Sequence, residues 1–205
     1  MTNTADMLDE KRVNPDPIKQ FEEWFQTAVD AQLPLPEAMS LATVNREGQP
    51  TARMVLLKRV DQDGFVFFTN YRSSKAKELE SNPNAALVFF WPQLERQVRV
   101  EGAVTKTSEE ESREYFASRP RGSQIGAWAS PQSQVIFSRE ELERRQAELE
   151  ELYRGRDVES PQHWGGFCLR PERIEFWKGR SDRLHDRILY EREPDGSWSI
   201  KRLAP

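Results

Sequence analysis

The chain has 205 residues, the length of one large domain. Its 30 Lys and Arg residues against 34 Asp and Glu residues give a net charge of −4, which argues against nucleic-acid binding because affinity for phosphate backbones needs surplus positive charge. A single cysteine, Cys168, excludes an internal disulfide framework and a metal site built from several cysteines. No apolar stretch is long enough to cross a membrane and the first residues lack a secretory signal, so we expect a cytoplasmic protein.

The amino-terminal part of the chain contains a clear helix start. We expect residues 1–13 to form a polar, mobile segment and residues 14–205 to form a single domain. Asp16 followed by Pro17 is typical of a helix start, because a capping side chain precedes a proline at the first helical position. The apolar face of this helix would consist of Phe21, Trp24, Phe25 and Ala28.

Apolar segments separated by short turns follow this helix, and they read as strands. They span residues 38–44, 51–60, 65–69, 85–91, 97–105, 173–177, 184–192 and 197–203. A short helix is expected over residues 75–80, and the capping boxes Ser108-x-x-Glu111 and Ser138-x-x-Glu141 predict two more. Since short turns favour antiparallel pairing, the pattern predicts an α+β fold: a mixed barrel or strongly curled, mainly antiparallel sheet with peripheral helices.

The segment from Thr69 to Lys75 joins an apolar strand to a helix start and carries hydroxyl groups and two cations, Arg72 and Lys75. Backbone N–H groups at the positive end of a helix bind anions, and Lys or Arg adds fixed charge. This favours a phosphate site. The same residues also suit an ordinary helix cap formed by Ser73 or Ser74, and both interpretations stay open.

Two further sets of side chains are candidates for anion binding. Arg53 and Lys58 lie at the two ends of an apolar strand, where period-two alternation places them on opposite faces. Tyr115 and Arg119 share one helix face, and Ser123 follows closely. The second set would suit a small aromatic phosphate, or simply a surface Arg packed along a half-buried Tyr.

Near the carboxyl terminus, Arg183, His185 and Arg187 would point to one face of a strand. This concentration of positive groups is costly unless an anion or protein carboxylates lie opposite. The only other histidine, His163, reads as structural, and two distant histidines without paired cysteines argue against a metal site. Cys168 reads as a small core residue.

Several long, ordered motifs connect these candidates. They are Arg53-Met54-Val55-Leu56-Leu57-Lys58, Glu95-Arg96-Gln97-Val98, Ser118-Arg119-Pro120-Arg121-Gly122-Ser123-Gln124-Ile125-Gly126-Ala127-Trp128, Glu175-Phe176-Trp177, Arg183-Leu184-His185-Asp186-Arg187 and Arg202-Leu203-Ala204-Pro205. In these motifs, from about Asp16 onward, the chain resembles the pyridoxine/pyridoxamine 5′-phosphate oxidase family.

The resemblance implies an FMN-binding split β-barrel that works as a homodimer with flavin at the subunit interface. The residues implied to hold FMN are Arg53, Met54, Val55, Leu56, Leu57, Lys58, Phe68, Thr69, Ser74, Lys75, Gln97, Gln132, Ser133, Trp177 and Arg187. Gln132, Ser133, Trp177 and Arg187 would complete the flavin site, partly from the other subunit. The residues implied to bind substrate are Lys58, Tyr115, Arg119, Ser123, Arg183, Leu184 and His185, with Arg183 and His185 as the catalytic pair.

The implied reaction is the oxidation of pyridoxamine or pyridoxine 5′-phosphate to pyridoxal 5′-phosphate, with O2 as electron acceptor and H2O2 as product. The chain departs from the family pattern at two places. Ser74 stands where the family has Arg, and we expect its hydroxyl and the helix N–H groups to serve the phosphate instead. Lys11 and Arg12 are present in the amino-terminal segment, but the family's Tyr of a substrate lid is not.

Two other functions are compatible with these residues. One is a split-barrel flavin- or deazaflavin-dependent reductase, and the other is a non-catalytic carrier of flavin or pyridoxal phosphate. The preference for amine or alcohol substrates and the presence of a secondary pyridoxal-phosphate site stay open.

Overall fold

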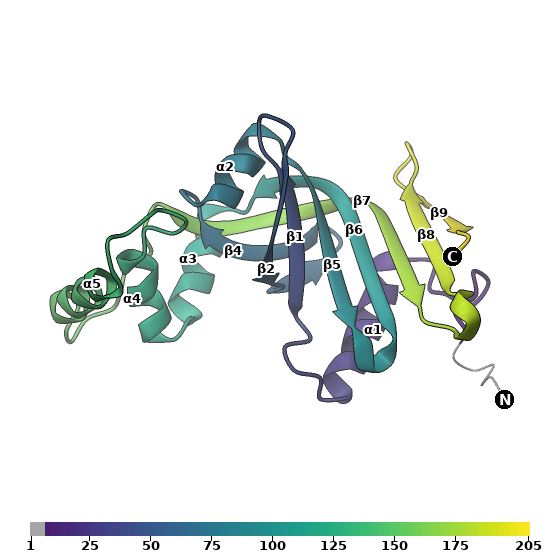
Figure 1. Cartoon of the computed structure of the whole chain (residues 1–205), viewed down its shortest axis with the longest axis horizontal. Helices are drawn as coiled ribbons and strands as arrows, with labels where there is room; N and C mark the ends of the chain where they lie inside the picture. Colours follow the sequence, from purple (N-terminus) through teal and green to yellow (C-terminus); the bar gives the residue numbers. More distant parts are fainter. Residues whose placement is uncertain (1–6) are drawn as a thin grey trace.

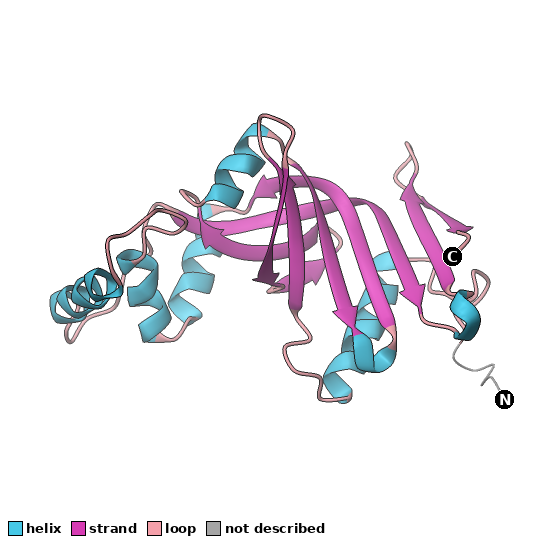
Figure 2. Ribbon diagram, in the orientation of Figure 1, coloured by secondary structure: helices cyan, strands magenta, loops and turns pink. Residues whose placement is uncertain are grey.

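The computed structural model describes residues 7–205, and its centre is one nine-stranded, antiparallel, strongly curled sheet (Figures 1 and 2). The strands are β1 (Ala38–Val44), β2 (Pro50–Leu56), β3 (Arg59–Asp61), β4 (Gly64–Asn70), β5 (Asn84–Trp91), β6 (Arg96–Lys106), β7 (Trp164–Lys178), β8 (Asp186–Arg192) and β9 (Trp198–Arg202). They follow the order β2-β1-β5-β6-β7-β4-β3, and β8 and β9 extend from β7. The α+β class and the mainly antiparallel, curled sheet are confirmed.

The long strand β7 connects the two ends of the sheet. Its first residues pair with β4, its last residues pair with β8, and β6 pairs with it from Phe167 to Lys178. A register shift between Glu101 and Gly102 interrupts the β6–β7 ladder. A Cβ atom at Gly102 would lie 2.0 Å from the Arg170 carbonyl oxygen, so only glycine allows the strands to approach this closely.

Five α-helices surround the sheet: α1 (Pro17–Asp30), α2 (Ser74–Ser81), α3 (Glu109–Ser118), α4 (Arg121–Ala129) and α5 (Arg139–Leu152). The predicted caps of α1 and α3 are present: Asp16 accepts a hydrogen bond from the Ile18 N–H (2.9 Å) and Ser108 accepts one from the Glu111 N–H (3.0 Å). Ser73 and Ser138 occupy the N-cap positions of α2 and α5 but make no side-chain capping hydrogen bond. Helix α1 fills the curl of the sheet, while α3, α4 and α5 form a separate lobe on the left of Figure 1. No helix within residues 7–205 is both long and apolar enough to span a membrane.

Two predicted strands differ in the structure. The segment 51–60 divides into β2 and β3, because the N–H of Lys58 bonds to the Val66 carbonyl (2.8 Å). The segment 184–192 begins as a strand only at Asp186, because a 3-10 turn, η3 (Ser181–Arg183), with positive φ at Asp182 and Arg183 precedes it. The expectation that Arg183, His185 and Arg187 share one strand face is therefore wrong.

The sequence analysis did not predict helix α4 and predicted only the last part of strand β7. Helix α4 starts directly after Pro120, which serves as its N-cap. Strand β7 is far longer than the predicted segment 173–177.

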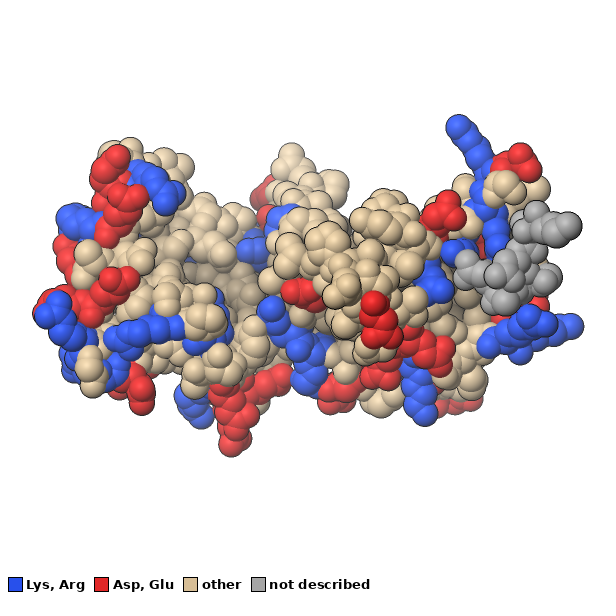
Figure 3. Space-filling view, turned by 90° about the horizontal axis from the view of Figure 1, so that it is seen from below, with Lys and Arg blue, Asp and Glu red and all other residues tan. Residues whose placement is uncertain are grey.

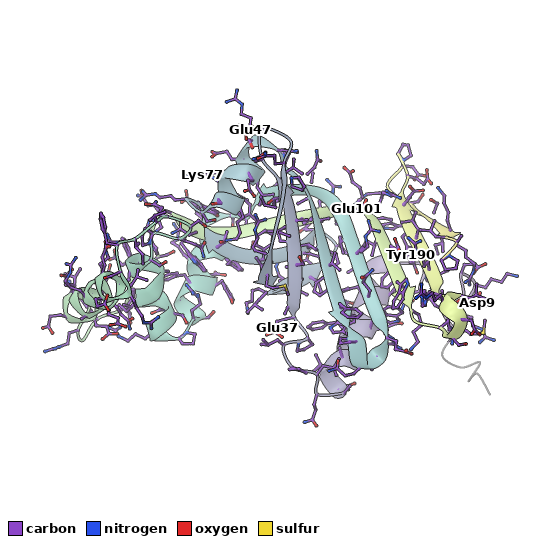
Figure 4. All side chains as sticks on the ribbon, in the orientation of Figure 1. Asp9, Glu37, Glu47, Lys77, Glu101 and Tyr190 are labelled. Carbon is purple, nitrogen blue, oxygen red and sulfur yellow. The ribbon has the colours of Figure 1, made fainter. Side chains whose placement is uncertain are left out.

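Part of the amino-terminal segment expected to be mobile, residues 1–6, lies outside the described residues. Leu8 is buried in the core, and the Arg202 guanidinium of β9 donates to the Leu8 carbonyl (2.9 Å) and to Glu10 (2.6 Å). Asp9 accordingly lies beside the carboxyl-terminal strands in Figure 4. The mobility of residues 1–13 and a domain spanning 14–205 stay predictions.

Helix α1 should be essential for the stability of the sheet. Phe21 is fully buried, with ring centroids 4.9 Å from Phe65 and 4.8 Å from Phe89. We expect Phe21→Ala to lower the free energy of unfolding by about 3–5 kcal/mol, because it leaves a cavity among these rings. The control Val29→Ala, on the exposed side of the same helix, should cost less than about 1 kcal/mol. Urea denaturation measures both, and equal losses would contradict this packing.

Candidate functional site

A groove of about 470 Å³ runs between β2 and β4 on one side and α3 and α4 on the other. It is lined by Met54, Val55, Leu56, Lys58, Phe68, Thr69, Asn70, Lys75, Tyr115, Arg119, Ser123, Gly126, Ala127, Ser130, Gln132 and Trp164. Figure 3 shows this face hollowed between the helical lobe and the sheet. Most of the side chains predicted to bind flavin or substrate phosphate therefore converge in one place.

Lys75, at the start of α2, brings a buried positive charge to the groove. The residue is only 9% exposed, and its Nζ lies 3.2 Å from Thr69 Oγ1 and 3.4 Å from Gln132 Oε1. Burial and the nearby Arg53 lower its pKa. Among residues 7–205 no carboxylate forms an ion pair with this ammonium group, so its charge is solvated only by neutral oxygens.

Arg53 lies behind Lys75 rather than in the groove. Its guanidinium is paired with Glu78 of α2 (2.8 Å) and bonded to Thr43 and Thr51, on the opposite face of β2 from Met54. Burial opposes ionisation of Glu78, but hydrogen bonds from Thr43, Thr51 and Arg53 outweigh it and lower the pKa of this carboxyl. Two cations thus face one carboxylate here, which leaves a surplus positive charge.

Arg119 is the second cation of the groove, and its side chain is half-buried. Its guanidinium lies 4.6 Å from the centroid of the Trp164 ring, and its buried Nη1 has no hydrogen-bond partner among the described residues. Burial lowers its pKa. Phe68 stacks on Tyr115 (4.0 Å between centroids) and on Trp164 (5.4 Å). These three rings form an aromatic wall beside the Arg119 guanidinium.

Besides Arg53 and the residues at the far end of β7, three more predicted residues do not line the groove. Leu57 is buried in the core, where its N–H bonds to the Glu37 carbonyl (2.9 Å). Ser74 is exposed on the first turn of α2. Ser133 is exposed beside Gln132 and has a φ of 68°.

The remaining predicted residues form a second group, which we call the strand-end cluster: Gln97, Trp177, His185 and Arg187. Gln97, Trp177 and Arg187 are direct neighbours across β6, β7 and β8, and the His185 ring lies 4.7 Å from Trp177. Trp164, in the groove, and Trp177 are thirteen residues apart along β7, up to ~43 Å at about 3.3 Å per residue. Gln97 therefore lies beside Trp177 and outside the groove of its own chain.

The loop beside this cluster carries the catalytic pair predicted from the sequence. Arg183 and Leu184 are exposed there. His185 Nδ1 accepts a hydrogen bond from the Arg180 N–H (3.1 Å). Since a backbone amide can only donate, the neutral imidazole carries its proton on Nε2.

Trp164 and Glu78 were missed at the sequence level. Trp164 carried a signal, because it precedes Gly165-Gly166 at the start of an apolar strand. Glu78 carried none, because its contact with Arg53 joins residues 25 positions apart. A larger hollow of about 720 Å³ beside Cys168 contains none of the predicted site residues.

The buried charge of Lys75 should cost stability in the ligand-free protein. We expect Lys75→Met to raise the free energy of unfolding at pH 7 by roughly 1 kcal/mol, because an apolar chain replaces a buried, unpaired ammonium group. Because the pKa of Lys75 is lower in the folded than in the unfolded protein, the folded state loses this proton first as pH rises toward 10.5. In that range the unfolded state binds more protons than the folded state, so the stability cost of the buried charge in the wild type shrinks.

Urea denaturation of the ligand-free protein at pH 7 and pH 10 measures this difference. The control is Lys77→Met on the exposed side of the same helix (Figure 4), which should change little at either pH. A Lys75→Met variant less stable than wild type at both pH values would contradict the assignment of an unpaired charge.

Sequence comparisons place this arrangement in a known family. Residues 25–153 match the family described as pyridoxamine 5′-phosphate oxidase, and residues 164–205 match the pyridoxine 5′-phosphate oxidase C-terminal dimerisation region. The pyridoxine/pyridoxamine 5′-phosphate oxidase of Rubrobacter xylanophilus is 60% identical, covering 97% of this chain and 91% of that protein. The protein of the same name from Burkholderia mallei is 57% identical over 100% of both chains.

Solved structures show the same fold. PhzG from Burkholderia lata 383, in complex with tetrahydrophenazine-1-carboxylic acid, has a TM-score of 0.92 at 30% identity and covers 98% of each chain. A pyridoxamine 5′-phosphate oxidase-related, FMN-binding protein from Nostoc punctiforme has a TM-score of 0.74 at 18% identity, covering 93% of this chain and 98% of that one. The chain therefore belongs to the pyridoxine/pyridoxamine 5′-phosphate oxidase family and has its split β-barrel fold.

Proposed function

We propose that this protein is an FMN-dependent pyridoxine/pyridoxamine 5′-phosphate oxidase that works as a homodimer. The observation that carries the proposal is a pair of cations in the groove, the buried Lys75 and the half-buried Arg119, neither of which has a carboxylate partner among residues 7–205. A buried charge without a counter-ion is costly unless a ligand supplies one. Two such cations suit two phosphate monoesters, one on a flavin and one on a substrate.

The first monoester fits the start of α2. Lys75 and Arg53 together outnumber Glu78 in positive charge there. The backbone N–H groups of the first helical turn have no intrahelical acceptor and favour an anion. Ser74 would add a hydroxyl donor where the family has Arg, so we expect affinity for the flavin phosphate to depend mainly on Lys75.

The second monoester fits the neighbourhood of Arg119. Lys58, Tyr115 and Ser123 line the same part of the groove and would complete its hydrogen bonds. The aromatic wall of Phe68, Tyr115 and Trp164 lies beside these donors. The residues present therefore fit an aromatic phosphate.

The homodimer accounts for the separation between the groove and the strand-end cluster. One chain alone would hold flavin in an open groove, because its own Trp177 and Arg187 lie at the far end of β7. In a twofold dimer the cluster of each chain can cover the groove of its partner. The matched C-terminal dimerisation region, residues 164–205, contains Trp177, His185 and Arg187 and supports this arrangement.

Flavin, when bound, would supply two-electron redox chemistry and pass the electrons to O2. The protein's own residues would orient the substrate and exclude water. His185 would present its Nε2–H to the substrate, since Nδ1 is engaged by the Arg180 amide. Arg183, exposed in the same loop, would orient the substrate ring and stabilise charge that develops on the substrate.

PhzG gives a specific second candidate. That protein is solved with tetrahydrophenazine-1-carboxylic acid, a reduced tricyclic carboxylic acid. Arg119 could hold a carboxylate as well as a phosphate. The curated relatives at 57–60% identity carry the oxidase name, which favours the vitamin B6 substrates. The reductase and carrier alternatives gain no support from these relatives.

An anaerobic titration tests the proposed reaction. We expect the purified protein to be yellow and pyridoxamine 5′-phosphate to bleach its flavin stoichiometrically, followed by recovery of colour and release of H2O2 on addition of air. Pyridoxamine without the phosphate should bleach it at least about tenfold less efficiently, because Arg119 then has no partner. Bleaching only by a tetrahydrophenazine carboxylic acid or only by a nicotinamide would contradict the proposal, as would ligand retention without turnover.

Arg183 should act on the chemical step. We expect Arg183→Met to slow anaerobic flavin reduction by about 10²-fold or more, because it removes a group that stabilises developing charge, while the affinity for FMN changes less than about threefold. Stopped-flow absorbance measures the first effect and flavin fluorescence the second. Unchanged reduction kinetics would refute the role of Arg183.

A further inference from the structure

Arg187 of the strand-end cluster is held by contacts that the proposed function does not yet use. Its Nε donates to Glu175 Oε1 (2.7 Å), its Nη2 to Glu175 Oε2 (3.1 Å) and its Nη1 to the Ala204 carbonyl (2.9 Å). A guanidinium has five N–H groups, so two remain available on Arg187. The two parallel bonds to one carboxylate also set the plane of the guanidinium.

Glu175 is unusual among the carboxylates of the sheet because it is buried, with only 7% of its surface exposed. It also accepts a hydrogen bond from Arg99 Nη1 (3.2 Å), so it lies between two arginines. On β7 it is two residues before Trp177, and the two side chains share one face of the strand. Glu175 thereby determines where the Arg187 guanidinium lies relative to Trp177.

We propose that Glu175 is a positioning residue for flavin binding: it orients Arg187 so that the two free N–H groups meet the flavin held in the partner's groove. This inference rests on the proposed function, because it requires Arg187 to contact flavin across the dimer. Glu175 itself touches neither flavin nor substrate. Its contribution is to remove rotamer freedom from a long side chain before the ligand arrives.

The direction of the effect distinguishes positioning from simple charge. Removal of a carboxylate makes the cluster more positive, so a purely electrostatic role predicts tighter binding of the anionic FMN after Glu175→Gln. A positioning role predicts weaker binding. A purely structural role in the cross-strand ion pairs predicts no change in FMN affinity once the dimer is folded.

The experiment titrates flavin-free homodimers with FMN and follows the quenching of flavin fluorescence. We expect Glu175→Gln to raise the dissociation constant about five- to twentyfold and to shift the absorption spectrum of bound flavin toward that of free flavin. The matched control is Glu101→Gln on β6 (Figure 4), which removes a carboxylate bonded to Arg99 and Arg173 but not to Arg187. Its affinity and spectrum should stay within about twofold of wild type.

A double-mutant cycle with Arg187→Ala shows whether Glu175 acts through Arg187. We expect Glu175→Gln to have no further effect in the Arg187→Ala background. Arg187→Lys, which keeps the charge but not the fork, should weaken binding almost as much as Arg187→Ala and should also be insensitive to Glu175→Gln. This second variant keeps the test valid if Glu175→Gln fails to fold.

Three outcomes would overturn the inference. They are unchanged or tighter FMN binding by Glu175→Gln, an equal loss in the presence and absence of Arg187, and wild-type affinity in Arg187→Lys. If Arg187→Ala itself binds FMN normally, the placement of Arg187 at the flavin fails together with the inference. If Arg187→Ala binds weakly while Glu175→Gln binds normally, only the positioning role fails.

Discussion

Lys75 and Arg119 carry positive charge into a groove where the described residues offer neither of them a carboxylate. Lys75 is buried and Arg119 is half-buried with its Nη1 atom enclosed, and burial lowers the pKa of each. A protein that retains two such cations sacrifices stability unless anionic ligands compensate them. The rest of the site follows from this constraint, since the aromatic wall and the start of α2 supply ring contacts and N–H donors around the same two charges.

The length of β7 separates two groups of predicted site residues within one chain. Strand β7 belongs to the groove at Trp164 and to the strand-end cluster at Trp177. The close approach of β6 and β7 at Gly102 interrupts the ladder between these two ends. Glu175 and Trp177, which belong to one sequence motif, therefore lie near the far end of β7 and away from the groove of the same chain. In the proposed homodimer the strand-end cluster of one chain would lie against the groove of its partner, and the family's dimerisation region covers this part of the chain.

Local signals in the sequence predicted the local structure well. Asp16-Pro17 marked the start of α1, and Ser108 and Ser138 marked the starts of α3 and α5. Period-two alternation holds within β2, where Arg53 lies on the opposite face from Met54, but Lys58 lies beyond the end of this strand and outside the alternation. The same alternation failed at Arg183, because the positive φ values of Asp182 and Arg183 have no signature in non-glycine residues.

Long-range contacts could not be predicted. Arg53 pairs with Glu78, and Arg187 pairs with Glu175. Strand and helix packing brings these residues together, and no local sequence signal distinguishes these two carboxylates from the many others in the chain. The family resemblance grouped Gln97 with the groove residues and Gln132 with Trp177 and Arg187, whereas within one chain Gln97 pairs with Trp177 and Gln132 lines the groove. Which residues of the two sets bind flavin stays a prediction.

Subunit mixing tests most directly whether each site is shared between two chains. Lys75→Met damages the groove and Arg187→Ala damages the strand-end cluster, so each variant homodimer should bind FMN weakly. When the two variants are unfolded and refolded together, heterodimers should contain one undamaged site each, and about a quarter of all sites should regain wild-type affinity. If both lesions instead belong to a site within one chain, the mixture will bind no more FMN than the separate variants, and the account will be contradicted.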